Sequence, residues 1–496
     1  MTAPADTPSA EDFRPQPRAP RGFPDRRAAA VTGEAHVVQA ALGVFQAWGY
    51  ERIDTGAFEY ADALGKFLPD QDRPNAGVFS LQDDDGQWMS LRYDLTAPLA
   101  RFVAASFDTL PKPFRRCAAG PVWRNEKPGP GRFREFWQCD ADTVGSARPE
   151  ADAEAIAMLS AAIRAAGVPA PLLRINVSNR KLLDGLLAGI GLDPADTGRR
   201  LTVLRAVDKL DRLGPEGVAL LLGAGRRDES GDFTPGAGLA AAAIDQVLAF
   251  TDTARATRAA TLEALAPVIG STAIGTEGLT ELQAIDTALA ALGVDEAAAV
   301  FNPAIVRGLE YYTGPVFEAE FLGETMDEKG NAVRFGSVGS GGRYDDLVMR
   351  FRGERVPATG CSVGVSRLVA ALEAAGTKAG QGAGPVVVLV LDADAMGGYL
   401  AMAQELRAAG IPAEVYLGAA GMKAQMKYAD RRNAPVAVIE GSNERASGTV
   451  MLKDLALGKA LAAGISDNEA WRRDRPAQRE VSRASLVEAV RAMVAG

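Results

Sequence analysis

Two strand-like segments joined by a short Pro- and Gly-rich tip constrain the fold of this chain more than any other feature. Residues 117–124 and 134–141 have strand patterns, and the segment between them contains Pro-Gly-Pro-Gly at 128–131. Strands connected through such a tip form a hairpin and therefore pair antiparallel. The sequence predicts an antiparallel pair in the first part of the chain.

Three blocks follow from the apolar pattern of the 496 residues. The first, up to about residue 195, mixes helical and strand patterns, whereas residues 196–285 are rich in Ala and Leu and predict helices. Strand patterns then return before a Gly- and Ala-rich linker at 377–384, and residues 1–17 predict a flexible tail. The predicted elements are helices at 31–48, 96–105 and 364–373, and strands at 50–58, 89–93, 298–302, 316–321 and 334–339.

The last block, after the linker, alternates strands with helices. Strands are predicted at 386–391, 413–416, 435–440 and 449–455, and helices at 399–409 and 422–431. This alternation is typical of a small α/β domain with parallel strand pairing.

Histidine and cysteine are too scarce for several kinds of active site. His36 is the only histidine, and the spacing of the three cysteines matches no zinc motif. Metal–histidine chemistry and a Ser-His-Asp triad are therefore disfavoured, and the cysteine usage is typical of a reducing cytosol. No apolar run approaches the roughly 18 residues of a membrane span.

The negative charge of the chain is unevenly distributed. The net charge is -9, which argues weakly against a nucleic-acid partner. Residues 385–496 carry 14 Lys and Arg against 13 Asp and Glu, so the acidic excess lies before them. A solvated face and a nucleic-acid contact are both compatible with the basic clusters of this last block.

The predicted hairpin has the residues of a nucleotide site. Arg124 can bind a phosphate through its planar guanidinium, Glu126 lies two residues further on, and Phe136 on the return strand can stack on a base. Strand alternation places Phe136 and Gln138 on one face. An ordinary charged hairpin has a similar composition, so the residues alone leave both interpretations open.

Three segments in this order resemble the signature motifs of class II aminoacyl-tRNA synthetases. Residues 114–138 resemble the second motif, residues 358–368 the third, and residues 48–59 the first, which forms the dimer interface. Two further segments are similar to signatures of the histidyl-tRNA synthetase family, namely Val306-Arg307-Gly308-Leu309-Glu310-Tyr311-Tyr312-Thr313-Gly314 and Gly-Ser-Gly-Gly-Arg-Tyr-Asp-Asp-Leu at 339–347.

This resemblance implies an α+β fold with a class II antiparallel sheet flanked by helices. The catalytic domain would span 18–376 with a helical insertion at 196–285, and a C-terminal α/β anticodon-binding domain would span 385–496. The resemblance further implies a cytoplasmic homodimer without membrane association. Its substrates would be L-histidine, ATP with Mg²⁺, and tRNA(His).

The resemblance also assigns an ATP side to the site. Activation joins the carboxylate of histidine to the α-phosphate, so the protein supplies positioning and cations rather than a base. Arg307 would bridge the two substrates, Arg124 would contact the α-phosphate, and Arg367 would contact the γ-phosphate side and cover adenine. The further ATP or Mg²⁺ contacts implied are Phe136, Glu126, Arg132 and Glu318.

The resemblance also implies contacts to both ring nitrogens and to the α-ammonium group of the substrate histidine. Asp142 would accept from the ring N–H, and Tyr312 would serve the other nitrogen. The other histidine contacts implied are Asp94, Thr96 and Gln138 for the ammonium, Arg124 and Arg307, and Tyr311, which can equally be a packing residue. On the predicted helix 422–431, Lys423, Gln425 and Lys427 are candidate tRNA contacts, to phosphates rather than bases.

Two alternatives share this scaffold. One is a synthetase paralogue that regulates ATP phosphoribosyltransferase, and the other is a stand-alone tRNA-binding or sensor protein. The presence of Arg124, Arg307 and Arg367, together with the last block, favours the ligase.

The sequence departs from the family pattern at a few positions. Gly56 stands where the first motif usually has Pro, and Glu310 replaces the more usual Asp. The hairpin tip Lys-Pro-Gly-Pro at 127–130 lacks the residues expected to read the extra 5′ nucleotide of tRNA(His). Our hypothesis is that acceptor-end recognition is altered, and a sharp fall in charging rate on removal of that nucleotide would contradict it.

Overall fold

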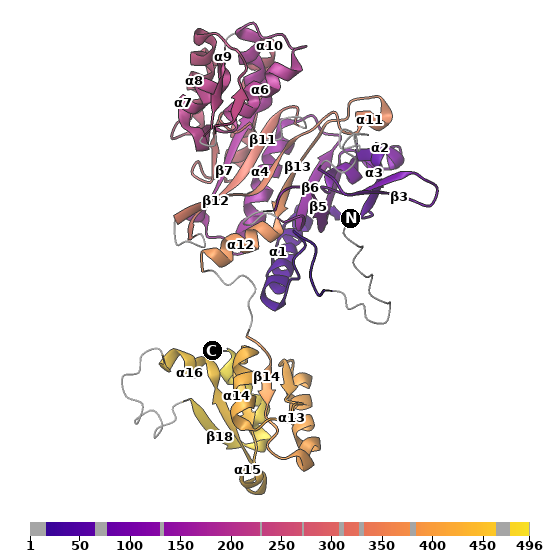
Figure 1. The fold of residues 1–496 in the computed structure, drawn as a ribbon, viewed down its shortest axis with the longest axis vertical. Helices are drawn as coiled ribbons and strands as arrows, with labels where there is room; N and C mark the ends of the chain where they lie inside the picture. Colours follow the sequence, from indigo (N-terminus) through magenta and orange to yellow (C-terminus); the bar gives the residue numbers. More distant parts are fainter. Residues whose placement is uncertain are drawn as a thin grey trace, which may run out of the picture. The chain divides into compact units, whose positions relative to one another are not determined.

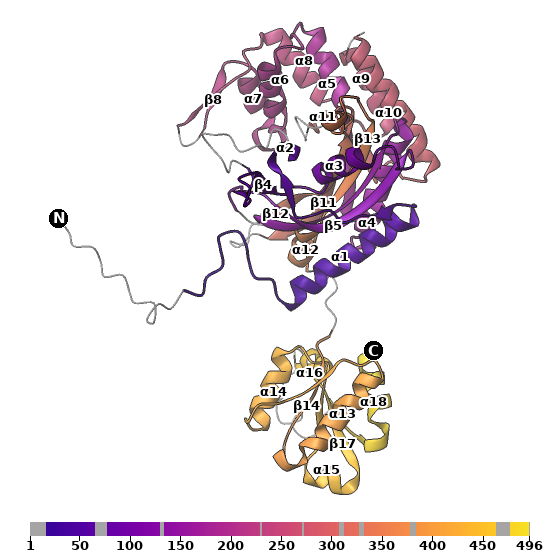
Figure 2. The same cartoon turned by 90° about the vertical axis from the view of Figure 1, so that its right-hand side faces the viewer.

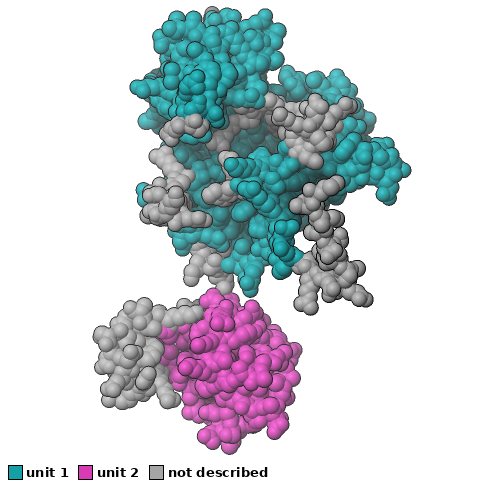
Figure 3. All heavy atoms as spheres, in the orientation of Figure 1, with its two compact units in different colours: residues 1–380 teal, residues 381–496 magenta. Residues whose placement is uncertain are grey.

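The computed structural model describes residues 16–64, 77–128, 133–228, 231–269, 272–306, 312–326, 332–376, 383–462 and 477–495. The chain divides into two compact units, residues 1–380 and 381–496 (Figure 3). Each unit is held together by a hydrophobic core of its own.

An eight-stranded sheet forms the centre of the first unit, with the strand order β1-β5-β6-β13-β12-β11-β7-β10 (Figure 1). Every pair from β5 to β7 is antiparallel, and β1 and β10 join the two edges in parallel. The bounds are β1 Glu51–Arg52, β5 Phe114–Trp123, β6 Glu135–Val144, β7 Leu173–Asn179, β10 Ala299–Phe301, β11 Pro315–Met326, β12 Ala332–Arg343 and β13 Ala358–Gly364. The predicted hairpin is β5–β6, so the antiparallel pair is confirmed.

The single strand predicted at 50–58 is wrong. The chain leaves the large sheet after Arg52 and enters a three-stranded sheet formed by β2 Phe58–Tyr60, β4 Trp88–Leu91 and β3 Ser80–Gln82. The guanidinium of Arg92 lies at this break, where Nη1 donates to the carbonyl oxygens of Thr55 at 2.8 Å and Gly56 at 3.4 Å. A buried charged donor thus binds the carbonyls that a continuous strand would have used for pairing.

Helices cover both faces of the large sheet (Figure 2). On one face, α1 Ala28–Ala47, α4 Pro149–Ala165 and α12 Val365–Ala374 enclose a core that includes the three cysteines. On the other face lie the short α2 Ala61–Leu64, α3 Thr96–Ser106 and α11 Met349–Arg352. The predicted helices at 31–48, 96–105 and 364–373 correspond to α1, α3 and α12.

Helix α1 is the one described helix whose length and composition would allow it to cross a membrane. The burial of its side chains is instead that of a core helix in a folded unit. Val37, Ala41 and Phe45 are fully buried, and the buried Glu34 forms an ion pair with Arg26 at 2.7 Å. Glu34 also accepts a hydrogen bond from Ser366 of α12, so a charged residue ties α1 to its neighbour.

Helices dominate the segment between β7 and β10 and gather beyond one end of the sheet (Figure 1). A small hairpin interrupts them, formed by β8 Gly225–Arg227 and β9 Phe233–Pro235, which the helical pattern of residues 196–285 did not predict. The helices are α5 Arg180–Gly189, α6 Thr197–Val207, α7 Leu210–Leu222, α8 Ala241–Thr251, α9 Arg258–Ile269 and α10 Ala273–Ala291. Helix α10 packs against α4 and α5, which attaches the segment to the sheet.

The second unit is a five-stranded sheet with the order β15-β14-β16-β17-β18. Its strands are β14 Val386–Val388, β15 Ala413–Val415, β16 Val436–Ile439, β17 Thr449–Asp454 and β18 Gln478–Ser482. Its helices are α13 Met396–Ala408, α14 Met422–Arg431, α15 Ser442–Ser447, α16 Leu455–Ala462 and α18 Leu486–Ala495.

The parallel pairing predicted for this unit holds for β14 with β15 and β16 but is wrong for β17. A parallel return needs a crossover of about a dozen residues or more. The short helix α15 and the left-handed Gly448, at φ 66°, reverse the chain too early for that, so β17 pairs antiparallel.

Candidate active site

The strand register arranges the residues of the site in rows, because directly paired residues point to the same face of a sheet. One row crosses four strands as Arg116, Asp142, Gly360 and Gly342. The neighbouring row consists of Ala118, Asp140, Ser362, Ser340 and Glu318. Five strands thus contribute to one polar face.

Two glycines leave space for the polar groups of the first row. A Cβ on Gly360 would clash with Oδ1 of Asp142, and a Cβ on Gly342 would lie 2.8 Å from Cδ1 of Tyr312. The carboxylate of Asp142 and the ring of Tyr312 therefore lie where ordinary side chains would otherwise be.

Asp142 is a buried carboxylate with two partners. Nη2 of Arg116 lies 3.0 Å from Oδ2 of Asp142, and the Tyr344 hydroxyl donates to Oδ1. Burial raises the pKa of Asp142, while the charge of Arg116 and the hydrogen bond from Tyr344 oppose this shift. Nη2 of Arg116 also donates to the carbonyl of Leu95 at 2.7 Å, which connects the sheet to the start of α3.

Tyr312 is suited to donate a hydrogen bond within this cluster. Burial raises the pKa of its hydroxyl, and the charges of Asp142, Asp140 and Asp94 add to this shift. The phenol therefore keeps its proton at neutral pH. The ring of Tyr312 lies against Gly342, which belongs to the same row as Asp142.

Asp94 and Arg124 both contact the chain around the start of α3. Oδ1 of Asp94 accepts hydrogen bonds from the backbone amides of Thr96 at 3.0 Å and Ala97 at 2.9 Å, in the first turn of α3. Nε of Arg124 donates to the carbonyl of Tyr93 at 3.1 Å. The charge of Arg124 lowers the pKa of Asp94 against the larger effect of burial, which raises it.

The described residues expected on the ATP side lie on three different elements. The guanidinium of Arg124 is 5.2 Å from the centre of the Phe136 ring, so these two residues of the hairpin lie close together. On α12, Nη2 of Arg367 donates to the carbonyl of Phe335 at 3.1 Å. Glu126 is exposed at the hairpin tip, whereas Glu318 is buried on β11. Arg132, Arg307 and Tyr311 lie outside the described residues.

The residues expected at the metal suit a magnesium ion that is held mainly by nucleotide. Within the described parts of the chain, no group of three or more His, Cys, Asp or Glu side chains could hold a metal ion. Mg²⁺ bound through one or two carboxylates and substrate phosphates needs no such group. A single buried carboxylate such as Glu318 fits that kind of site.

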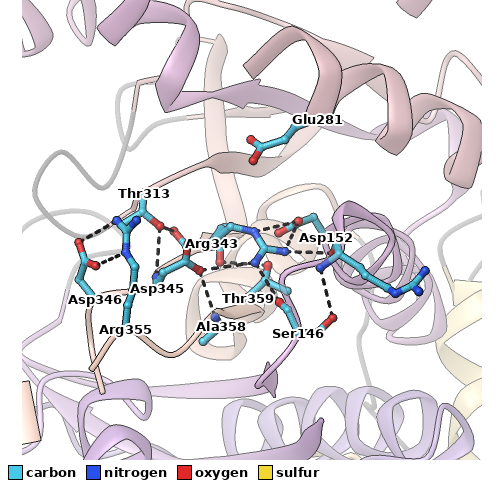
Figure 4. Close-up of polar contacts among 12 residues, drawn as sticks. Ser146, Asp152, Glu281, Thr313, Arg343, Asp345, Asp346, Arg355, Ala358 and Thr359 are labelled. Atoms are coloured by element: carbon cyan, nitrogen blue, oxygen red, sulfur yellow. Dashed lines mark hydrogen bonds and ion pairs between the residues drawn. The ribbon is translucent and has the colours of Figure 1, made fainter. Parts of the chain in front are cut away.

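A network centred on Arg343 fixes the Tyr312 end of β11 (Figure 4). The buried guanidinium of Arg343 contacts Oδ2 of Asp152 on α4 through Nη2 at 2.5 Å and Nε at 3.1 Å. The backbone amide of Thr313 donates to the carbonyl of Arg343 at 2.8 Å, and the amide of Asp345 donates to Oγ1 of Thr313 at 3.1 Å. The residue next to Tyr312 is therefore anchored to the helix layer through Arg343.

In the second unit, two of the three candidate tRNA contacts are available to a partner. Lys423 and Lys427 are exposed on α14, one turn apart. Gln425 is buried, and its side-chain amide accepts from the backbone N–H of Val390 and donates to the carbonyls of Val390 and Ala420. The prediction for Gln425 is therefore corrected, because its polar atoms join α14 to the strand end and are not free to contact RNA.

Sequence reasoning missed three buried residues of the pocket, namely Arg116, Asp140 and Tyr344. Asp140 was detectable, because period-two alternation places it on the same face as Gln138 and Asp142. Tyr344 lies within the recognised segment 339–347. Arg116 gave no local signal, because its role depends on the register of β5 with β6.

Comparison with known proteins identifies the family of the chain. A family model described as histidyl-tRNA synthetase matches residues 22–368, and one described as anticodon binding domain matches residues 385–493. The histidine–tRNA ligase of Caulobacter vibrioides is 61% identical over 498 residues and covers 100% of both chains. That of Brucella ovis is 56% identical over 478 residues, covering 96% of this chain and 95% of its own.

Solved structures share the fold. A histidyl-tRNA synthetase from Nostoc sp. PCC 7120 superposes with a TM-score of 0.73 at 26% identity, covering 97% of this chain and 100% of that one. A Bacillus halodurans protein described as an ATP phosphoribosyltransferase regulatory subunit/histidyl-tRNA synthetase gives a TM-score of 0.65 at 22% identity, covering 84% and 97%. The family match over most of the chain and the full-length identity to the Caulobacter protein lead to one conclusion: the chain belongs to the histidyl-tRNA synthetase family.

Proposed function

We propose that this protein is a cytoplasmic histidine–tRNA ligase. It activates L-histidine with ATP, releasing pyrophosphate, and then transfers histidine to the 3′ end of tRNA(His), giving AMP. The observation that carries the proposal is the buried Asp142, which is held by Arg116 and Tyr344 in a row whose Gly342 leaves room for the ring of Tyr312. Family membership supports the same reaction.

The pocket chemistry matches an imidazole ring. A neutral imidazole carries one N–H donor and one acceptor nitrogen. Asp142, whose negative charge Arg116 stabilises, accepts from the N–H, and the protonated Tyr312 donates to the other nitrogen. A side chain without this pair leaves both buried groups unpaired, which disfavours other amino acids strongly.

Activation needs alignment and positive charge. An oxygen of the histidine carboxylate attacks the α-phosphorus of ATP, and the bond from that phosphorus to the pyrophosphate oxygen breaks. Arg124 donates to the carbonyl of Tyr93, next to Asp94, and lies 5.2 Å from the centre of the Phe136 ring, which supports a role for its guanidinium at the junction of the two substrates. Arg307 and Arg367 add further positive charge by resemblance to the family, and Mg²⁺ bound with ATP offsets phosphate charge.

Histidine-dependent exchange of pyrophosphate into ATP tests this function. We expect exchange with histidine and Mg²⁺ and none with other amino acids. Because cations stabilise the charge that develops on the phosphate, Arg124→Ala or Arg307→Ala should lower the exchange rate by about 100-fold or more. Absence of exchange in the purified protein would reject the ligase and favour a regulatory paralogue.

Replacement of Asp142 by Asn tests the histidine contact. The amide cannot offer a charged acceptor to the ring N–H, so the KM for histidine should rise by about 10- to 100-fold while the KM for ATP changes little. Asp245→Asn is the matched control, because Asp245 is exposed on α8. An unchanged KM for histidine in Asp142→Asn would contradict the assignment.

We further propose that α1 forms part of a homodimer interface. A groove of about 990 Å³ runs beside α1, and its lining includes Val31, Val38, Leu42 and Trp137. Val31 is 50% exposed although it belongs to an apolar helix. The resemblance to class II synthetases, in which the first motif forms the dimer interface, supports a second copy of this chain as the occupant.

Light scattering or sedimentation tests the dimer. The mass should be twice the 52.0 kDa of one chain, and Val31→Glu should shift it toward the monomer because a charge would be buried at the interface. Leu220→Glu is a control at a residue of similar exposure, 53%, on α7. A wild-type monomer at micromolar concentration would contradict the proposal.

The exposed Lys423 and Lys427 support a contact between α14 and RNA phosphates. Phosphate contacts of this kind position RNA without reading its sequence. The expected effect of replacing both lysines by Ala is a weaker, less salt-dependent affinity for tRNA with unchanged pyrophosphate exchange, because exchange does not require tRNA.

A further inference from the structure

Asp140 is a buried carboxylate in the pocket for which the reaction described above has no use. It lies on β6 between Gln138 and Asp142 and faces the same side of the sheet. The side chain is almost wholly buried, and Ser362 on β13 donates to it. Its Oδ1 has no hydrogen-bond partner among the described residues.

A second buried oxygen without a hydrogen-bond partner among the described residues belongs to Gln138, two residues before Asp140. Nε2 of Gln138 donates to Oγ of Ser362 at 3.0 Å, and Oε1 of Gln138 has no hydrogen-bond partner among the described residues. Residues two apart on a strand lie roughly 6.5 Å from each other along the chain. Two buried acceptors without donors are costly, so their retention indicates a ligand that supplies several donors.

The chemistry of histidine offers one such group. The neutral ring has a single N–H, which Asp142 already accepts in the proposed function, whereas the α-ammonium group has three donors and no acceptor. The charge of Asp94 also acts on Asp140, and Oδ1 of Asp94 already accepts from two backbone amides.

We propose that Asp140 determines specificity for the amino group of the substrate: its unpaired oxygen accepts a hydrogen bond from the α-ammonium of histidine, beside Gln138 and Asp94. This inference rests on the proposed function and adds a residue that the resemblance did not assign. It also gives the site a second means of discrimination, because imidazole compounds without an ammonium group leave Asp140 unpaired.

The charge balance of the pocket supports a cationic ligand. The groups that act on Asp140 are Asp142 on its own strand, Asp94 before α3, Arg116 on β5 and the hydroxyl of Ser362 on β13, and the thiol of Cys139 lies next to it on β6. Burial and the neighbouring Asp142 raise the pKa of Asp140 to about 7. An ammonium group placed against Asp140 favours its ionised form and compensates part of this negative charge.

Calorimetric titration of Asp140→Asn and the wild-type protein with two ligands tests the proposal. L-Histidine carries the ammonium group, and imidazole-4-propionic acid has the same ring and carboxylate without it. We expect Asp140→Asn to raise the Kd for histidine by about 10- to 100-fold, the effect of losing a charged hydrogen bond, and to leave the Kd for imidazole-4-propionic acid unchanged. Asp245→Asn is the matched control for the same chemical change at an exposed site.

Three outcomes would overturn the proposal. An unchanged Kd for histidine would show that Asp140 does not bind the ammonium group, and an equal loss for both ligands would show that it only shapes the pocket. If pyrophosphate exchange in the wild type remained normal in either case, the proposed function would stand without this inference. Failure of the wild type to bind histidine would reject both.

Thermal unfolding separates this role from a structural one. A carboxyl whose pKa is raised by folding stabilises the protein at low pH, and this stabilisation is lost as the pH rises through the folded pKa. Asn carries no charge, so the Tm of Asp140→Asn relative to the wild type should increase from about pH 4 to about pH 7 and then level off. A Tm of Asp140→Asn below that of the wild type at pH 8 would indicate a structural role and contradict the proposal. Asp140→Ala provides a second variant for the binding test.

Discussion

The guanidinium of Arg116 is the group on which the carboxylate-rich face of the sheet depends. Asp94, Asp140 and Asp142 are all shifted toward their neutral forms by burial, and the charge of Arg116 opposes that shift in each case. A buried charge left without its partner typically costs about 3–5 kcal/mol. Arg116 therefore favours the ionised form of Asp142 against the effect of burial.

The strand register brings further residues next to the ion pair of Arg116 and Asp142. Asp142 lies against Gly360, Gly360 is paired with Gly342, and Gly342 leaves room for the ring of Tyr312. The network of Arg343 then ties the neighbouring Thr313 to the helix layer. A site held by several strands and a buried ion pair keeps its side chains in place better than one carried by loops, which suits a reaction that depends on alignment.

Local patterns predicted much of the fold. The Pro- and Gly-rich tip gave the β5–β6 hairpin, and apolar periodicity gave α1, α3 and α12. The break between Arg52 and Phe58 was missed because Arg92, distant in sequence, binds the carbonyls there. The antiparallel β17 was missed because its direction depends on the length of α15 rather than on any residue of the strand.

The site was predicted where it is encoded in motifs and missed where it depends on strand pairing. Arg124, Asp142 and Tyr312 lie in recognisable segments: Arg124 donates to the carbonyl of Tyr93, and the ring of Tyr312 lies against Gly342 in the row of Asp142. Arg116 becomes a pocket residue only through its register with Asp142, and Gln425 turned out to be a buried link rather than a surface contact. Placing a polar residue in a site thus required the tertiary structure.

The central claim is that Asp142 and Tyr312 bind one neutral tautomer of the imidazole ring. Nitrogen NMR of ring-¹⁵N-labelled histidine bound to the protein at pH 8 tests it directly. The account predicts two distinct ring signals, one from a protonated nitrogen bonded to Asp142 and one from an unprotonated nitrogen that accepts from Tyr312. Two protonated nitrogens, or signals averaged between tautomers as in free histidine, would contradict it.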